Sequence, residues 1–201
     1  MIFKNILRLK IPHQSVGQLH TTSPLLSSPP LQLTLAILKP DLVQHSPNLS
    51  QVQQMILQNK FLIVRSKIIS LPRSRAEQFY VEHKEKFFYN RLVTFMSSGP
   101  CQPLILARQD AIPGWRELMG PTKVFQTRYS HPDSIRGRFG LTDTRNCSHG
   151  SDSTETARTE MEFFFPEFDK EQWEQEERPM FEKGSLTFDF KSFIHTVKTQ
   201  G

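Results

Sequence analysis

The sequence has few cysteines and no long apolar run. Its 201 residues include only Cys101 and Cys147, which are too few for a disulfide framework or a zinc cluster. No apolar stretch approaches the roughly 18 residues that a membrane span needs, so we expect no membrane span. The length and the 37% content of hydrophobic residues are enough for one domain with a core.

Two common nucleotide-binding motifs are also absent. The chain contains neither G-x-x-x-x-G-K-[ST] nor G-x-G-x-x-G, so nothing supports a P-loop or protein-kinase fold. The formal net charge is +5, which favours anionic partners. Charge alone does not distinguish nucleotides from nucleic acid or a membrane surface.

Acidic residues are missing from the first 40 positions. Lys4, Arg8 and Lys10 are spread among apolar side chains, and a stretch rich in Ser, Thr and Pro follows at residues 15–30. This composition is typical of a mitochondrial transit peptide; a disordered tail and a secretory signal are the alternatives. We therefore expect residues 1–30 to be a targeting or disordered segment and the protein to lie in the mitochondrial matrix.

From residue 31 onward, the apolar pattern alternates between strands and helices. Strands are expected at residues 32–38, 61–71 and 103–108. Helices are expected at residues 50–60 with Ser50 as the cap, after a capping box at residues 74–77, and at residues 92–96, 112–119 and 153–164. Residues 122–148 show no clear periodicity and suggest a long loop. This order indicates an α/β or α+β sandwich with helices packed on one sheet.

His149 stands between that loop and the expected start of a helix at Ser153. The neighbouring Gly150 would let a substrate phosphate approach the backbone, and a helix start offers free N–H groups to an anion. Ser151 and Asp152 can hold a side chain in one orientation. An imidazole is a competent nucleophile when one nitrogen is free and the other is hydrogen-bonded. Taken alone, a loop histidine is more often an ordinary surface or capping residue.

Cationic side chains gather in the same part of the sequence. Phosphoryl transfer depends on positive charge around the phosphate oxygens, and guanidinium groups suit those oxygens. The basic residues are Arg116, Lys123, Arg128, Arg136, Arg138 and Arg145, and Lys39 follows the first expected strand. Each could be a solvated surface charge, but together they favour a phosphate site.

Five segments resemble the nucleoside diphosphate kinase family. They are AILKPD (36–41), FYVEH (79–83), LVTFMSSGP (92–100), IRGRF (135–139) and RNCSHGSDS (145–153). Their order matches the family and their spacing is close to it. The last segment contains the N-x-x-H-G-S-D element, which is highly specific. Within the family, the chain resembles the divergent type-six, mitochondrial branch.

The resemblance implies a ferredoxin-like βαββαβ core with additional helices at residues 31–166. Residues 167–201 depart from the family's ending and read as an acidic C-terminal extension, an appended helix or a tail. The implied reaction is ping-pong: ATP or another nucleoside triphosphate gives its γ-phosphoryl group to His149, which passes it to a nucleoside diphosphate. Mg²⁺ would be held by the nucleotide phosphates and not directly by the protein.

The resemblance also implies a role for each matching residue. Glu160 would fix the imidazole of His149 and hydrogen-bond Ser151, and Tyr80 would lie behind the nucleophile. The base would stack on Phe88 beside Leu92. The sugar would be bound by Lys39 and Asn146, and the phosphates by Lys39, Arg116, Thr122 and Arg136.

Two segments depart from the family pattern. Residues 44–49 replace a Gly-rich turn, and the loop before Arg136 is longer than usual. Both positions contribute to subunit contacts in the family, so a homo-oligomer would have altered interfaces. The alternative to an active kinase is a weakly active, partner-dependent member that acts mainly by binding another protein. A nucleic-acid enzyme is disfavoured because the aromatic residues are not interleaved with the basic ones.

Overall fold

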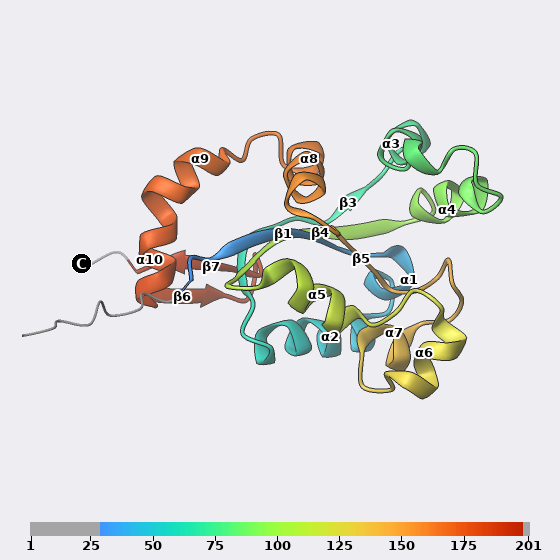
Figure 1. Cartoon of the computed structure of the whole chain (residues 1–201), viewed down its shortest axis with the longest axis horizontal. Helices are drawn as coiled ribbons and strands as arrows, with labels where there is room; N and C mark the ends of the chain where they lie inside the picture. The colour runs from blue at the N-terminus through green and yellow to red at the C-terminus, as the bar shows by residue number, and fades with distance from the viewer. Residues whose placement is uncertain (1–28, 199–201) are drawn as a thin grey trace, which may run out of the picture.

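A mixed α/β domain surrounds one antiparallel sheet in the computed structural model, which describes residues 29–198. The strands are β1 (Gln32–Leu38), β2 (Leu62–Ser66), β3 (Ile69–Ser70), β4 (Pro100–Arg108) and β5 (Ser148–Gly150). Their order is β2-β4-β1-β5, with β3 paired to β4, and each pairing is antiparallel. Figure 1 shows this central sheet edge-on. The order confirms the expected ferredoxin-like core.

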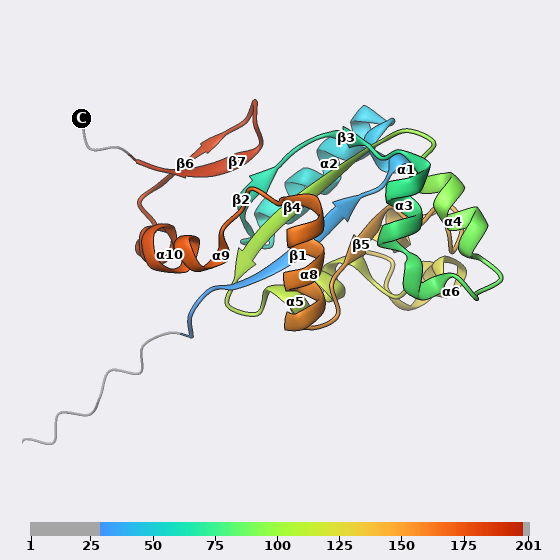
Figure 2. The same ribbon diagram turned by 90° about the horizontal axis from the view of Figure 1, so that it is seen from above.

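Helices cover both faces of the sheet, as Figures 1 and 2 show. They are α1 (Pro40–Val43), α2 (Ser46–Gln58), α3 (Arg73–Phe79), η1 (Val81–His83), α4 (Tyr89–Met96), α5 (Ala111–Met119), α6 (Val124–Ser130), α7 (Ile135–Phe139) and α8 (Thr154–Phe164). Leu35 and Ile37 of β1 pack with residues of α4 and α8, while Ala36 and Leu38 pack with residues of α2 and α5. Burial on both faces explains why β1 is an almost continuous apolar run.

Three element boundaries agree with local sequence signals. β1 has the predicted bounds, and α5 ends at Gly120, whose φ of +78° suits glycine. Ser153 caps α8 through its side chain, which accepts the N–H of Thr156, and the Thr156 hydroxyl accepts the N–H of Ser153. The structure confirms these three predictions. Each of them depends on residues only a few positions apart.

Two predicted helix starts are wrong. Ser50 is not a cap: α2 begins at Ser46, and the preceding His45 ring accepts the N–H of Asn48 at 3.4 Å. The departing segment 44–49 therefore opens a helix. No capping box forms at residues 74–77, because α3 begins one residue earlier and Glu77 pairs with Arg73 at 2.9 Å.

The middle of the chain is more structured than its sequence pattern indicates. The strand predicted at residues 61–71 is divided into β2 and β3, with an irregularity between Ile63 and Arg65 in the pairing with β4. β4 starts at Pro100, before the predicted residue 103. Residues 122–148 are not one long loop, because they contain α6 and α7 and reach β5.

The C-terminal extension packs against the domain. Its elements are α9 (Lys170–Gln172), η2 (Trp173–Glu177), α10 (Arg178–Lys183), β6 (Leu186–Asp189) and β7 (Ile194–Val197). Trp173 and Phe181 are buried in the cluster that contains α8, and Phe193 is buried in the opposite cluster. A helix was among the expectations, but the β6–β7 hairpin was not.

Two further expectations concern membranes and targeting. Over residues 29–198, no helix is long and apolar enough to cross a membrane. The expected targeting segment, residues 1–30, falls almost wholly outside the described residues.

Candidate active site

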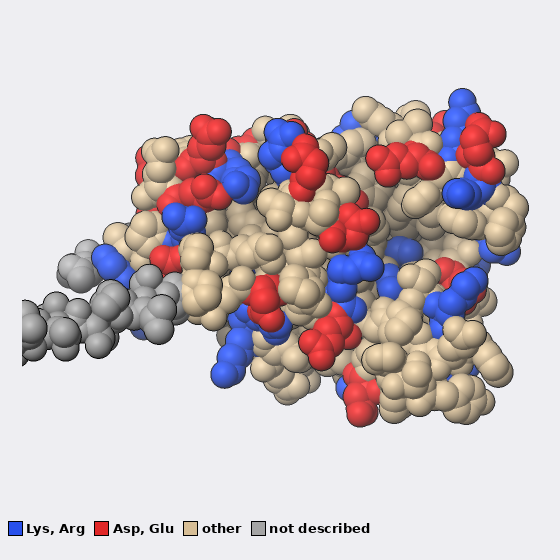
Figure 3. Space-filling model, in the orientation of Figure 1, with Lys and Arg blue, Asp and Glu red and all other residues tan. Residues whose placement is uncertain are grey.

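A cavity of about 700 Å³ opens between the α3–α4 segment and the loop and helices of residues 116–136. Figure 3 shows this face hollowed there, with Lys and Arg atoms visible inside the hollow. Every predicted site residue except Ser151 lines the cavity. These residues are Lys39, Tyr80, Phe88, Leu92, Arg116, Thr122, Arg136, Asn146, His149 and Glu160. Ser151 is buried beside the cavity and contacts Glu160.

His149 lies on a strand and not in a loop. β5 pairs with β1, which places His149 opposite Ile37, and the indole N–H of Trp115 donates to the His149 carbonyl at 3.0 Å. A Cβ atom on Gly150 would lie 2.3 Å from Cδ1 of Trp115. This glycine therefore makes room for Trp115, and it also lines the cavity, where the expected approach of a phosphate to the backbone stays a prediction. Trp115 was not singled out from the sequence.

The imidazole of His149 is held by a chain of two hydrogen bonds. Its Nε2 lies 2.8 Å from one carboxylate oxygen of Glu160, and Ser151 donates to the other oxygen at 2.6 Å. An ionised carboxylate only accepts hydrogen bonds, so Nε2 carries the proton in this pair. In the neutral ring, Nδ1 then keeps its lone pair. The geometry orients one nitrogen and leaves the other free to react.

Two aromatic rings pack against the imidazole. The ring of Tyr80 lies edge-on to that of His149 with centroids 6.4 Å apart, and the ring of Phe79 is closer, at 5.3 Å. The Tyr80 hydroxyl is buried without a hydrogen-bond partner in residues 29–198, and burial raises the pKa of Tyr80. Phe79 was expected only as an apolar helix position, and its contact with His149 gave no separate sequence signal.

Lys39 is a buried cation at the end of β1. Its Nζ donates to the side-chain oxygen of Asn146 at 2.7 Å, and the Asn146 amide donates to the Asp143 carbonyl at 3.0 Å. Burial, together with the charge of Arg136, lowers the pKa of Lys39 to about 8. No carboxylate hydrogen-bonds Lys39 in the described part of the chain, so an anionic ligand would find an available charge.

Asp41, whose role gave no signal in the sequence, supports the segment behind Lys39. The N–H of Cys147 donates to the Asp41 carboxylate at 3.1 Å, and the N–H of Lys39 donates to the Cys147 carbonyl at 2.8 Å. Cys147 has a φ of +69°, which non-glycine residues rarely adopt. Burial raises the pKa of Asp41. Asp41 therefore holds the segment that carries Asn146.

Arg136 is the second buried cation of the cavity. Its guanidinium donates to the carbonyls of Gly120 at 2.7 Å and Ser148 at 2.9 Å, and burial lowers its pKa to about 10. The side chain of Thr122 is 3.5 Å away. Arg116 is exposed, and its charge also lowers the pKa of Arg136. Two guanidinium groups close enough for one to lower the pKa of the other form a site that suits a polyphosphate.

Another wall of the cavity is aromatic and apolar. Phe88 precedes α4 and contacts the rings of His83 at 5.7 Å and Phe87 at 5.5 Å. Leu92 lies one turn into α4 and is mostly buried. A cavity with a cationic wall and an aromatic wall can bind a molecule that has phosphates and a planar ring. Lys123, one of the basic residues expected near a phosphate, also lines the cavity. Lining residues that gave no signal in the sequence include Glu82, His83, Phe87, Arg91, His131 and Asp143.

The fold and the cavity together are those of a nucleotide phosphotransferase. The chain matches the family described as nucleoside diphosphate kinase over residues 32–170. Nucleoside diphosphate kinase 6 of Danio rerio is 53% identical over 168 residues, which cover 84% of this chain and 95% of that protein. The Homo sapiens protein of the same name is 51% identical, and the match covers 85% of this chain and 92% of that protein.

Solved structures are also similar to this chain. The Aquifex aeolicus nucleoside diphosphate kinase has a TM-score of 0.64 and 38% identity, with 67% of this chain and 95% of that one covered. The Encephalitozoon cuniculi enzyme has a TM-score of 0.62 and 25% identity, with 67% and 88% covered. The chain belongs to the nucleoside diphosphate kinase family, which confirms the resemblance seen in the sequence, including its likeness to type-six members.

Proposed function

We propose that this nucleoside diphosphate kinase carries the phosphoryl group on Nδ1 of His149. The observation that supports this most directly is the hydrogen-bonded chain from Ser151 through Glu160 to Nε2 of His149. These hydrogen bonds leave Nδ1 as the reactive nitrogen, beside a cavity with buried cations. The same cavity would serve the donor and the acceptor nucleotide in turn.

The reaction has two balanced steps. In the first, the Nδ1 lone pair attacks the γ-phosphorus, an N–P bond forms, and the P–O bond to the departing nucleoside diphosphate breaks. In the second, a terminal phosphate oxygen of the acceptor diphosphate attacks the same phosphorus, and the N–P bond breaks. The developing imidazolium charge would be stabilised by Glu160.

The remaining residues would bind the nucleotide. Arg116, Thr122 and Arg136 would hold the phosphates, which spreads the negative charge of the transition state. Nζ of Lys39 lies 2.7 Å from Oδ1 of Asn146. Both side chains would bind the sugar hydroxyl, and Lys39 would also lie near the incoming phosphate. Phe88 and Leu92 would contact the base. Stacking without contacts to the base edges tolerates any base.

Mg²⁺ would be held mainly by the nucleotide phosphates. Over residues 29–198, no group of three His, Cys, Asp or Glu side chains could hold a metal alone. Mg²⁺ keeps several waters and commonly binds through substrate phosphates, which fits the expectation that the protein does not hold it directly. When bound, the ion would supply positive charge to the phosphate oxygens.

Labelling tests the phosphohistidine. The full chain is incubated with γ-labelled ATP and Mg²⁺, and the label should be acid-labile, alkali-stable and removed by GDP. His149→Ala should abolish the label, whereas His45→Ala should keep it because His45 lies outside the cavity.

The outcomes separate the two candidate functions. Label that persists in His149→Ala would overturn the assignment of the nucleophile. A wild-type chain that takes no label would instead favour the partner-dependent alternative.

We also propose that residues 1–30 direct import into the mitochondrial matrix. The support is their composition, since residues 1–40 contain basic and hydroxyl side chains but no acidic ones. A reporter fused to residues 1–30 should enter mitochondria, and a variant with Lys4, Arg8 and Lys10 changed to Glu should not. A wild-type fusion that stays in the cytosol would refute the proposal.

A further inference from the structure

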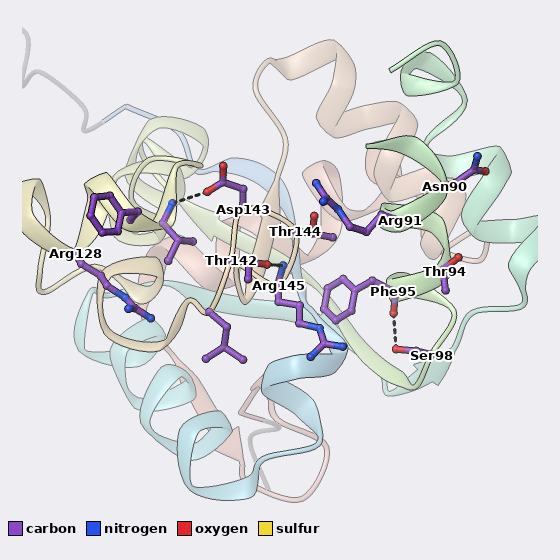
Figure 4. Close-up of a pocket in the computed structure, with 13 residues that line it drawn as sticks. Asn90, Arg91, Thr94, Phe95, Ser98, Arg128, Thr142, Asp143, Thr144 and Arg145 are labelled. Carbon is purple, nitrogen blue, oxygen red and sulfur yellow. Dashed lines mark hydrogen bonds between the residues drawn. The ribbon is translucent and has the colours of Figure 1, made fainter. Parts of the chain in front are cut away.

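A second hollow, of about 900 Å³, lies next to the nucleotide cavity. We call it the α4–α6 groove, because its walls are α4, α6 and the loop at residues 141–145. Figure 4 shows Arg91 and Phe95 of α4 facing Thr144 and Arg145 of that loop. Arg91, Asp143 and Thr144 line both the groove and the nucleotide cavity. The other groove residues take no part in the proposed catalysis.

The groove is positively charged. Arg91, Arg128 and Arg145 line it, and none of them forms an ion pair with an acidic residue of the described chain. Arg128 donates to the Gly140 carbonyl at 2.7 Å, and Arg145 lies over the ring of Phe95. The one acidic lining residue, Asp143, already pairs with Lys123 at 3.1 Å. The groove therefore lacks complementary negative charge.

The groove and its rim are also apolar. Val124 and Phe95 are buried in its walls, while Phe125 is 73% exposed and Leu141 is 59% exposed. Tyr129 stands beside Phe125 on α6, with ring centroids 5.6 Å apart, and is 77% exposed. Large exposed apolar side chains that lie together commonly mark protein-binding surfaces.

We propose that the α4–α6 groove binds an acidic segment of a partner protein, with an aromatic or aliphatic side chain of that segment in contact with Phe125 and Leu141. The arginines would pair with its carboxylates, and the apolar walls would cover its anchor. Arginine and aromatic side chains are the residue types that contribute most at such interfaces.

Charge argues against two occupants from this chain itself. The N-terminal 40 residues contain no Asp or Glu, so they repel the groove. The acidic C-terminal segment of a second copy is partly neutralised, because four of its carboxylates are already paired. Those pairs are Glu167 with Lys67, Glu174 with Lys170, Glu177 with Arg65 and Glu182 with Arg178.

A nucleic-acid strand fits the groove less well than a protein segment. Phe95 and Phe125 offer aromatic faces, but Val124 and Leu141 are aliphatic and offer none to a base, and the Asp143 carboxylate lies among the lining residues. Aliphatic walls instead pack against apolar side chains of a protein.

Selection from a library of random displayed peptides tests the proposal with the full chain as target. The selection should enrich peptides that combine several Asp or Glu residues with a Phe, Trp or Leu. Phe125→Ala should weaken the affinity for a resynthesised peptide about 30-fold, which is the effect typical of losing an aromatic anchor. Arg128→Gln should also weaken binding of the peptide, while substitution of the exposed Lys183 of α10, Lys183→Gln, should not. Added salt should weaken binding.

Three results would overturn the proposal. The first is a selection without acidic peptides, or peptides whose affinity is unchanged by Phe125→Ala and by the second rim variant Leu141→Ala. The second is a single-stranded oligonucleotide that binds the wild type more tightly than the peptides and depends on the same residues. The third is self-association in sedimentation experiments that Phe125→Ala abolishes, because the occupant would then be a second copy. Melting curves establish that the variants are folded.

Discussion

Asp41 is the residue whose importance is least visible in the sequence. Its carboxylate accepts the N–H of Cys147, a residue held at positive φ. The residues on either side of Cys147 hold the two buried cations, because Asn146 bonds Lys39 and the Ser148 carbonyl bonds Arg136. Asp41 is therefore a positioning residue that acts through the backbone of its neighbours.

Two substitutions of Asp41 should have different effects. Asp41→Ala removes the acceptor of a buried N–H, so we expect a loss of about 1–3 kcal/mol in the free energy of unfolding. Asp41→Asn keeps an oxygen acceptor and should lose less. Both remove a negative charge that raises the pKa of Lys39, so kcat/KM should begin to fall at a lower pH in both. Denaturant unfolding and pH profiles measure the two effects, and unchanged profiles in both variants would contradict this role.

Lys39 should impose an alkaline limit on the free enzyme. Burial lowers its pKa from 10.5 to about 8, so the ammonium is charged below that pH and neutral above it. We expect kcat/KM to fall as the pH rises through about 8, because the neutral amine no longer attracts phosphate. In the nucleotide complex, the phosphates should raise this pKa and move the fall in kcat to higher pH. Lys39→Gln should lower kcat/KM and remove its fall at alkaline pH. A fall that persists in this variant would mean that another group titrates there.

The chemical types of the site residues could be predicted from the sequence, but their contacts could not. Lys39 and Asn146 are 107 positions apart, and only the resemblance to a family placed them in one site. Phe79 looked like an ordinary apolar helix position and Trp115 was not singled out, since nothing local distinguishes an aromatic side chain that contacts a catalytic histidine. Long-range contacts of this kind depend on strand pairing, which a single sequence does not specify.

At the scale of elements, α5 packs closely against β5 at Gly150. Trp115 of α5 donates to the His149 carbonyl and occupies the space where a Cβ on Gly150 would stand. This contact sets the distance between the helix and the strand that carries the nucleophile.

Gly150→Ala should therefore disturb both stability and activity. We expect a cost of about 1–3 kcal/mol from overpacking, together with a lower kcat as His149 is displaced. Trp115→Phe should recover part of the loss in the double variant, because the smaller ring leaves room for the new methyl group. A double-mutant cycle of unfolding free energies measures this coupling. Strictly additive effects would contradict the contact.

The β6–β7 hairpin meets the sheet through a histidine. The ring of His195 on β7 accepts the N–H of Ile63 on β2 at 2.9 Å, and burial lowers the pKa of His195 below 6.5. The unfolded chain would bind the proton first, so stability should be lost as the pH falls below 6.5 and be fully present above it. His195→Asn, which keeps an acceptor without titrating, should lose less stability on acidification. Equal acid sensitivity of the two proteins in urea unfolding would refute this.

Element prediction succeeded where the signal was local and failed where it was not. Ser153 and Gly120 marked helix ends correctly, because a cap is made by neighbouring residues. The short α6, α7 and β5 gave no periodic pattern, since seven, five and three residues show too few repeats to detect. Residues 74–77 have the spacing of a capping box, but the Glu77 carboxylate pairs with Arg73 instead. A polar pair at the right spacing therefore does not always form a cap.

At the scale of the whole molecule, the C-terminal extension completes both sides of the core. Trp173 and Phe181 are at most 3% exposed in one cluster, and Phe193 is 8% exposed in the other. Figure 2 shows the extension running from the α9–α10 helix beside the sheet into the hairpin near β2. Its acidic composition suggested an appended helix or a tail, and its aromatic residues carry the packing.

Removing this extension should destabilise the domain severely. Losing one large buried aromatic side chain costs about 3–5 kcal/mol, while a whole domain is stable by only about 5–15 kcal/mol. A chain that ends at residue 168 should therefore aggregate or melt at a much lower temperature, whereas a chain that ends at residue 198 should match the full chain. Trp173→Ala is the milder variant and should shift urea unfolding by the cost of one such residue. A chain ending at residue 168 that melts like the full chain would show that residues 31–166 fold independently and that the aromatic contacts of the extension contribute little.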